Sequence, residues 1–133
     1  MIAVKATREG LPGGQTSSGY RIDAVVPFVA LPAAAALRQW VIVTNPLNGK
    51  SIRALLLDVG PWNVNDNAYV FQPSTTQPHQ DGVVYVPVRP QAEAGLDVSH
   101  NGKTNGAGID LGEAVWTALG MLDNGQVLWE FAI

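Results

Sequence analysis

The stretch Ala54-Leu55-Leu56-Leu57-Asp58-Val59-Gly60-Pro61-Trp62 holds the strongest structural signal in the chain. Its apolar run predicts a strand buried on both faces, because a strand with one solvated face alternates apolar and polar residues. The run delivers the carboxylate of Asp58 and stops at a Gly-Pro turn. A second stretch, Gly108-Ile109-Asp110-Leu111-Gly112, delivers another carboxylate just before a helical pattern. Two such groups suit a glycan-cleaving site, although turns and helix caps use them too.

The rest of the chain predicts a mainly β domain with short elements. Alternation predicts strands at residues 2–7, 20–26, 40–45, 51–57, 83–88 and 126–131. Asn48-Gly49 predicts a hairpin with a type I′ turn. The apolar stripe from Leu111 to Leu119 predicts a short helix with Gly120 at its C′ position. Leu31 to Leu37 is ambiguous, because four alanines favour a helix that is too short to be stable alone.

The length of 133 residues predicts one domain, residues 1–133, with a long insert at about 63–105. Cysteine is absent, which excludes disulfides and Cys-ligated metals. The net charge of -3 without a basic face argues against nucleic-acid binding. We expect no membrane span, since no apolar run reaches about 18 residues, and no signal peptide at Met1 to Lys5. A place in the cell envelope or outside the cell would need another export route, and the oligomeric state stays open.

Several short segments keep a fixed order along the chain: Thr16-Ser17-Ser18-Gly19, Val41-Ile42-Val43-Thr44-Asn45, Asn48-Gly49-Lys50, Asp58-Val59-Gly60-Pro61 and Ile109-Asp110-Leu111, with Leu119-Gly120-Met121 behind. Together they resemble the double-psi β-barrel of the rare lipoprotein A group, which is related in fold to expansins, family 45 endoglucanases and MltA-type lytic transglycosylases. The resemblance implies a six-stranded barrel with one or two short helices and a groove across one side. It also implies a glycan ligand, most often peptidoglycan, that is either cleaved or only bound.

Asp110 matches the acidic residue that the endoglucanase and MltA-type relatives use as general acid. Its apolar neighbours Ile109 and Leu111 favour the raised pKa that this role needs. The alternative is a capping box with Glu113, three residues later, at the start of the helix. A capping role would lower the pKa of Asp110, so the two interpretations make opposite predictions.

Asp58 matches the Asp of the Asn-Asp-Arg-Gly-Pro segment of the rare lipoprotein A group, with Val59 in place of the Arg. The resemblance implies a second catalytic carboxylate, which would stabilise an oxocarbenium-like charge or act as base. The alternative is an Asx-turn in which Asp58 accepts backbone N–H groups ahead of Gly60-Pro61.

Four residues are candidates for substrate binding: Trp62, Tyr20, Asn63 and Tyr69. Trp62 follows the Gly-Pro turn, where an aromatic face can stack on a sugar ring, although core packing is the alternative. Tyr69 lies in the insert and would line a cleft or a satellite cluster. Trp40, Trp116 and Trp129 lie in strand or helix patterns that favour core packing.

No metal site and no cofactor are expected. The two histidines, His79 and His100, stand in polar loop sequence without the spacing of a metal site. Either would serve as acid or base only if the insert folded over the groove. Asp23 is a weak candidate for a substitute carboxylate.

Two departures from the lytic group favour a non-catalytic reading. Tyr20 stands where that group has a Glu, and apolar Phe28 to Ala30 occupy the region of its His. An endoglucanase-like or MltA-like use of Asp110 does not require those two residues. The expected function is still cleavage of peptidoglycan by a lytic transglycosylase or glycoside hydrolase with Asp110 as general acid. The alternatives are an expansin-like glycan-binding module, or a structural barrel in a phage or secretion apparatus.

Overall fold

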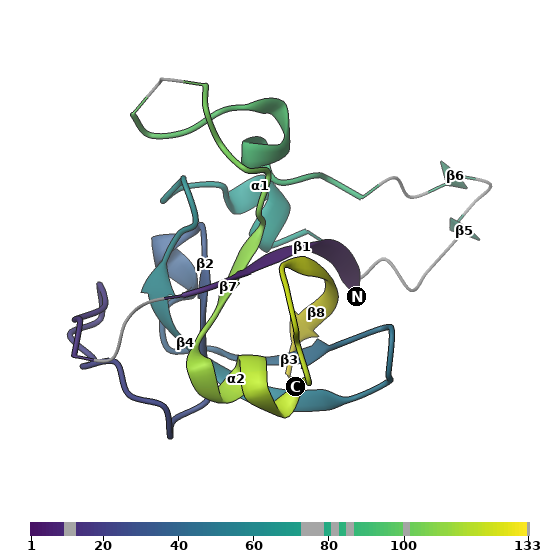
Figure 1. Cartoon of the computed structure of the whole chain (residues 1–133). Coiled ribbons are helices and arrows are strands. Elements are labelled where there is room, and N and C mark those ends of the chain that lie inside the picture. The colour runs from purple at the N-terminus through teal and green to yellow at the C-terminus, as the bar shows by residue number, and fades with distance from the viewer. Residues whose placement is uncertain (10–12, 73–78, 81–82, 85–86, 100–101, 133) are drawn as a thin grey trace.

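A closed β-barrel forms the body of the molecule, which the computed structural model describes at residues 1–9, 13–72, 79–80, 83–84, 87–99 and 102–132. The six strands run around the barrel in the order β1-β7-β2-β4-β3-β8 (Figure 1). They are β1 (Ile2–Arg8), β2 (Phe28–Leu31), β3 (Trp40–Thr44), β4 (Ser51–Val59), β7 (Ile109–Leu111) and β8 (Gly125–Phe131). The prediction of a mainly β, six-stranded barrel is confirmed.

The remaining described elements are short. They are the α-helices α1 (Asn67–Val70) and α2 (Glu113–Ala118), the 3-10 turns η1 (Ala34–Ala36) and η2 (Gln91–Ala94), and the two-stranded ladder of β5 (His79–Gln80) and β6 (Val83–Val84). In Figure 1, α2 lies across one end of the barrel, whereas α1 and η2 lie toward the other. The two ends are thus covered by different parts of the chain.

The barrel combines two kinds of strand pairing. β1 pairs with β7 and β2 pairs with β4 in parallel, and the other four neighbouring pairs are antiparallel. Alternate residues of each strand face inward, and the closed interior includes the fully buried side chains of Val4, Val29, Val43, Leu56 and Ile109. Closing the sheet leaves no unpaired barrel edge. The core therefore lies inside one continuous ladder.

A β-bulge in β4 determines which way Asp58 faces. Val29 of β2 pairs with Leu56, but the next residue, Ala30, pairs with Asp58, so the register shifts by one residue. Without this shift, the period of two would give Asp58 the inward orientation of Leu56. The bulge leaves Leu57 in a second apolar cluster outside the barrel with Phe28. Bulges of this kind re-aim a side chain, and here the carboxylate moves to the outer face.

The segment 63–105 is joined to the barrel through specific contacts. Tyr69 of α1 is fully buried in the main core, where its hydroxyl donates to the carbonyl of Gly108 at 2.9 Å. The carboxylate of Asp66 accepts the N–H of Gln91 at 2.8 Å. Asn63 donates from its side-chain amide to the carbonyl of Leu96 at 2.9 Å. The described part of the predicted insert is thus held as part of the fold.

Most of the predicted elements are confirmed, with shifted ends. The strands at 2–7, 40–45, 51–57 and 126–131 correspond to β1, β3, β4 and β8, and the predicted helix corresponds to α2, with Gly120 at a φ of 65°. The ambiguous run contains only η1. Of the predicted strand at 83–88, Val83 and Val84 form β6, and residues 85–86 lie outside the described residues.

The predicted strand at 20–26 is wrong, and β2 follows it instead. The carboxylate of Asp23 accepts the N–H groups of Val25 and Val26 at 2.8 and 3.0 Å, which makes this segment a turn. These bonds also lower the pKa of Asp23, so its use as a substitute catalytic carboxylate is not supported. Barrel pairing begins only at Phe28, after Pro27.

Two finer predictions also need correction. The hairpin at Asn48-Gly49 is present, but of these two residues only Gly49 has a positive φ, 74°, so the turn is not type I′. Trp40 is 45% exposed rather than part of the core. Its ring lies 5.1 Å from the guanidinium of Arg53, a cation–π contact on the surface.

Gly112 is required by the close approach of β2 to the start of α2. A Cβ atom there would lie 2.5 Å from a ring carbon of Phe28 and 2.9 Å from its carbonyl oxygen. We expect Gly112→Ala to lower the free energy of unfolding by about 2–3 kcal/mol, measured by urea denaturation. The control is Gly125→Ala, where the nearest atom to a Cβ is at 3.9 Å. Equal losses in both variants would contradict this packing argument.

Candidate functional site

Two carboxylates face outward from β7 and β4, the two barrel strands that pair with β2. Ala30 of β2 pairs with Asp58 on one side and with Asp110 on the other, and Asp110 pairs with Thr7 of β1. Residues paired across a sheet share a face, so Thr7, Asp110, Ala30 and Asp58 form one row. Asp58 and Asp110 stand two inter-strand spacings apart, roughly 10 Å between their Cα atoms. The small side chain of Ala30 lies between them.

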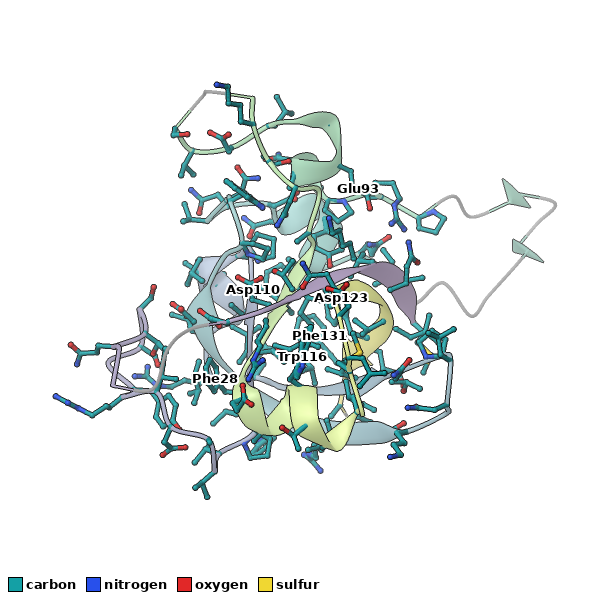
Figure 2. The ribbon with its side chains drawn as sticks, viewed as in Figure 1. Phe28, Glu93, Asp110, Trp116, Asp123 and Phe131 are labelled. Carbon is teal, nitrogen blue, oxygen red and sulfur yellow. The ribbon has the colours of Figure 1, made fainter. Side chains whose placement is uncertain are left out.

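Asp110 is not a helix cap, and the predicted capping box is wrong. The N-cap of α2 is Gly112, and its carbonyl accepts the N–H of Trp116 at 2.9 Å. Asp110 lies instead in β7, where it accepts a hydrogen bond from the hydroxyl of Thr7. Figure 2 labels Asp110 near the crossing of β1 and β7, away from Trp116 near α2.

The environment of Asp110 favours its protonated form. Burial, with a smaller contribution from the negative charge of Asp58, raises the pKa of Asp110 to about 6 against the opposing effect of the hydrogen bond from Thr7. A carboxyl group with a pKa near 6 can hold a proton at mildly acidic pH and release it to a substrate. This is the pKa direction that the general-acid interpretation predicts.

Glu9 brings a third carboxyl group to the site. Its N–H donates to the carbonyl of Leu111 at 2.8 Å, which continues the pairing of β1 with β7 by one residue. The period of two then places Glu9 on the same face as Thr7. Burial, the hydrogen bond with Asp58, and the charges of Asp58 and Asp110 raise the pKa of Glu9 to about 9. Glu9 is therefore protonated at neutral pH.

Asp58 is the ionised partner in this group. Its Oδ1 accepts hydrogen bonds from the backbone N–H groups of Ser17 and of the next residue, Val59, both at 2.9 Å. Burial alone would raise the pKa of Asp58, but the hydrogen bonds from Glu9, Ser17 and Val59 lower it below its ordinary value. The alternative interpretation holds in part: Asp58 accepts backbone N–H groups ahead of Gly60, but no Asx-turn forms, since the N–H of Gly60 donates to the carbonyl of Leu31.

An open hollow of about 400 Å³ lies over the row. It is lined by the residues Thr7, Arg8, Glu9, Pro61, Trp62, Asn105, Asp110 and Asn124. Asp58 is not among them, but its carboxylate shares a hydrogen bond with the side chain of Glu9, which is. The hollow therefore offers a ligand two protonatable carboxyl groups, and the negative charge of Asp58 is hydrogen-bonded to one of them, Glu9.

Trp62 forms a wall of this hollow rather than part of the core. Its indole N–H donates to the side-chain oxygen of Asn105 at 2.8 Å. Its backbone has a φ of 69°, and the N–H of Asn63 donates to the carbonyl of Pro61 across it at 2.8 Å. A bulky residue in this conformation costs about 1–3 kcal/mol, which functional sites tolerate more often than other places do. The ring is half-buried, so part of its surface is available to a ligand.

Arg8 closes the side of the hollow nearest α2. Its guanidinium donates two hydrogen bonds to the carboxylate of Glu113, both at 2.6 Å, and lies 5.7 Å from the ring of Trp116. Glu113 is therefore engaged with β1 rather than with the N-terminus of its own helix. Such a bidentate contact fixes the orientation of the arginine side chain.

Three predicted substrate-binding residues do not line the hollow. Tyr69 has no exposed surface, so the prediction that it contacts substrate is wrong. The ring of Tyr20 packs against Phe28, with the ring centroids 5.4 Å apart, in the second apolar cluster. Asn63 lines another cavity of about 560 Å³, formed by residues 63–65, residues 91–98 and Gly102. Of the predicted substrate-binding residues, the structure brings only Trp62 to Asp110.

The histidine predictions lie outside what the structure describes. His100 is outside the described residues, and of His79 only the backbone, in β5, is described. Among the described residues, no group of three or more His, Cys, Asp and Glu side chains is arranged to hold a metal ion. No helix in the same residues is long and apolar enough to cross a membrane.

Comparison with known proteins identifies a family. The chain belongs to the family described as "Domain of unknown function (DUF8814)", whose family model matches residues 1–129. No curated protein matches the sequence. Among solved structures, the chain is similar to one described as "Streptomyces papain inhibitor (SPI)", with 17% sequence identity and a TM-score of 0.49. That match covers 99% of this chain and 94% of the other.

Proposed function

We propose that this protein cleaves the glycosidic bonds of a glycan strand, with peptidoglycan as the expected substrate, and that Asp110 is the general acid. The observation that carries the proposal is the position of Asp110, a largely buried carboxyl group with a pKa of about 6 that still lines an open hollow beside Trp62. Carboxyl groups whose pKa is strongly raised by burial occur more often in the clefts of functional sites than elsewhere.

The barrel itself supports the resemblance to the double-psi β-barrels. The strands follow the order β1-β7-β2-β4-β3-β8 around the barrel, so that strands far apart in the sequence lie side by side. Two of the neighbouring pairs, β1 with β7 and β2 with β4, are parallel. This arrangement is compatible with the double-psi topology that the sequence resemblance implies. We therefore assign the chain to that class as part of the proposal.

In the proposed reaction, Asp110 donates its proton to the glycosidic oxygen as the bond from that oxygen to the anomeric carbon breaks. The positive charge that develops on the sugar is stabilised by the negative charge of Asp58. The 6-hydroxyl of the same sugar then forms a bond to the anomeric carbon, and its proton returns to Asp110. No nucleophilic side chain is required. Water in place of the 6-hydroxyl would give hydrolysis with the same proton balance.

The spacing of the two aspartates is compatible with this chemistry. Their Cα atoms lie roughly 10 Å apart, two strand spacings, and the short side chains lie on one face. Glycosidases that leave room for an attacking group between their carboxyl groups have separations of about 6.5–9.5 Å.

Digestion of purified peptidoglycan sacculi, with mass spectrometry of the released material, tests the proposal at pH 5–6. Anhydro-sugar products would identify a lytic transglycosylase, and reducing-end products would identify a hydrolase. Protein that sediments with the sacculi without releasing material would contradict cleavage and leave an expansin-like binding module. Protein that neither sediments with the sacculi nor cleaves them would contradict both, as expected for a structural barrel.

Trp62 is expected to supply stacking affinity for the glycan. We expect Trp62→Ala to weaken binding to sacculi or to soluble glycan strands about 10- to 100-fold, since an aromatic anchor of this kind contributes up to a few kcal/mol. Trp40→Ala is the matched control, because Trp40 is also exposed but does not line the hollow. If the two variants bind equally well, Trp62 does not contact the glycan.

A further inference from the structure

The proposed reaction gives no role to Glu9, although Glu9 lines the same hollow as Asp110. The carboxyl group is held in place from two sides. Its backbone pairs with Leu111 of β7, and its side chain shares a hydrogen bond with Asp58 of β4. β7, β4 and the residue that follows β1 thus contribute one carboxyl group each. Because the fold holds the carboxyl group of Glu9 in one position beside Asp110, we expect Glu9 to have a role in the site.

Two carboxyl groups in hydrogen-bond contact need a proton between them, and the surroundings decide which one carries it. Asp58 accepts the N–H groups of Ser17 and Val59, and both bonds favour its charged form. Oε2 of Glu9 is buried and has no hydrogen-bond partner within the described residues. A charge there would be uncompensated, so the proton belongs to Glu9.

No described cation offsets a negative charge on Glu9. The charged or titratable groups that act on it from β4 and β7 are Asp58 and Asp110. On its own strand, the guanidinium of Arg8 is engaged with Glu113. A second negative charge at this point would face the charge of Asp58 directly. Such like-charge pairs in one site lose one of their charges by holding a proton.

We propose that Glu9 is a positioning residue, whose protonated carboxyl donates a hydrogen bond to Asp58 and holds it ionised and fixed beside Asp110. This inference rests on the proposed function for its catalytic consequence, but not for the hydrogen bond itself. Glu9 keeps the site at one fixed negative charge. That single charge is enough to favour the protonated form of Asp110 and, in the reaction, to stabilise the positive charge on the sugar.

Carboxyl ¹³C NMR titration of the intact protein tests the hydrogen bond without any substrate. We expect Glu9 to lose its proton near pH 9 and Asp58 to titrate below its ordinary range. Glu9→Gln keeps a donor and is expected to leave the Asp58 titration low, whereas Glu9→Ala removes the donor and is expected to raise it. A Glu9 carboxyl that titrates near its ordinary value of 4.5 would overturn the inference whether or not the protein cleaves glycan.

Kinetics on soluble glycan strands at pH 5.5 test the catalytic part. We expect Glu9→Ala to lower kcat by about 10-fold or more with KM changed less than about threefold, because binding groups remain while Asp58 is misplaced. Glu9→Gln is expected to recover most of that loss. If Glu9→Gln is as inactive as Asp110→Asn, Glu9 transfers a proton itself and the positioning role is wrong. If the wild-type protein cleaves nothing, the proposed function fails, while the NMR titration still decides the hydrogen bond.

Discussion

Asp110→Asn is expected to reduce glycan release by about a thousandfold or more, because an amide cannot transfer the proton that the leaving oxygen requires. Asn has nearly the same shape as Asp and keeps an oxygen that accepts the hydrogen bond from Thr7. Binding to sacculi should therefore persist. Mass spectrometry of released fragments, calibrated against wild-type digestion for the same time, measures the loss.

Misfolding would not explain such a loss. The pKa of Asp110 is raised to about 6 in the folded protein, so the folded state holds a proton that the unfolded chain releases from about pH 4 upward. Stability from this group is complete below that range and is lost as the pH rises through 6. Asp110→Asn removes this dependence, so the variant should be at least as stable as the wild type at pH 7. A less stable variant would contradict the buried-acid description.

The pH dependence of cleavage gives the same residue a second test. A general acid must be protonated, so the wild-type rate should fall tenfold per pH unit well above pH 6. Asp123→Asn is a matched control, since Asp123 is an exposed carboxylate that accepts only the N–H of Asn124 among the contacts described here. It should retain the wild-type rate and profile. A profile that is flat from pH 5 to pH 8 would exclude Asp110 as the acid.

Local pattern was enough to predict the parts of the barrel with alternating or strongly apolar strands. β3 and β4 follow from the run after Trp40 and from the turn at Asn48-Gly49, where Gly49 adopts the positive φ that the turn requires. β2 was missed because its four residues are all buried, on both faces, and so show no alternation. The segment 20–26 does alternate, but the turn bonds of Asp23 override that pattern.

The two aspartates of the site could be found in the sequence because Asp58 follows an apolar run near the end of a strand and Asp110 stands between apolar residues just before a helical pattern. Their relation could not, since it depends on the bulge at Leu57 and on both residues pairing with Ala30. Glu9 carries no motif and lies 49 residues from Asp58 in the sequence. The alternation of β1 gives the one available signal, because it places Lys5, Thr7 and Glu9 on the outer face.

The capping-box prediction shows why local motifs mislead at this position. Asp110 and Glu113 have the spacing of a capping box, but the chain extends β7 through Leu111, which leaves Gly112 as the N-cap. Glu113 then binds Arg8 of β1, the strand that pairs with β7. Because β7 pairs with β1, Asp110 and Glu113 both contact residues of β1 instead of the N-terminus of α2. The pKa of Asp110 is therefore raised rather than lowered.

Glu9→Gln is expected to stabilise the protein at alkaline pH. The size of this effect measures how much the carboxyl group of Glu9 lowers the free energy of unfolding. The pKa of Glu9 rises from 4.5 in the ordinary state to about 9 in the folded protein. The folded state therefore holds a proton that the unfolded chain gives up above pH 4.5. Stability from this group is complete below pH 4.5 and is lost progressively up to pH 9.

The amide of Gln stays neutral at every pH, so Glu9→Gln avoids this loss. We expect its free energy of unfolding at pH 8 to exceed that of the wild type by about 2–4 kcal/mol, after allowance for the partial exposure of the side chain. At pH 4 the difference should nearly vanish, because wild-type Glu9 is then largely protonated in both states. Urea denaturation at the two pH values measures both differences.

A gain of the same size at pH 4 and pH 8 would mean that Glu9 does not hold its proton in the folded protein. It would also mean that the carboxyl group of Glu9 is not hydrogen-bonded to Asp58. A gain confined to pH 8 would show that the fold retains a destabilising acid beside the hollow, as expected where a site is kept for its chemistry rather than for stability.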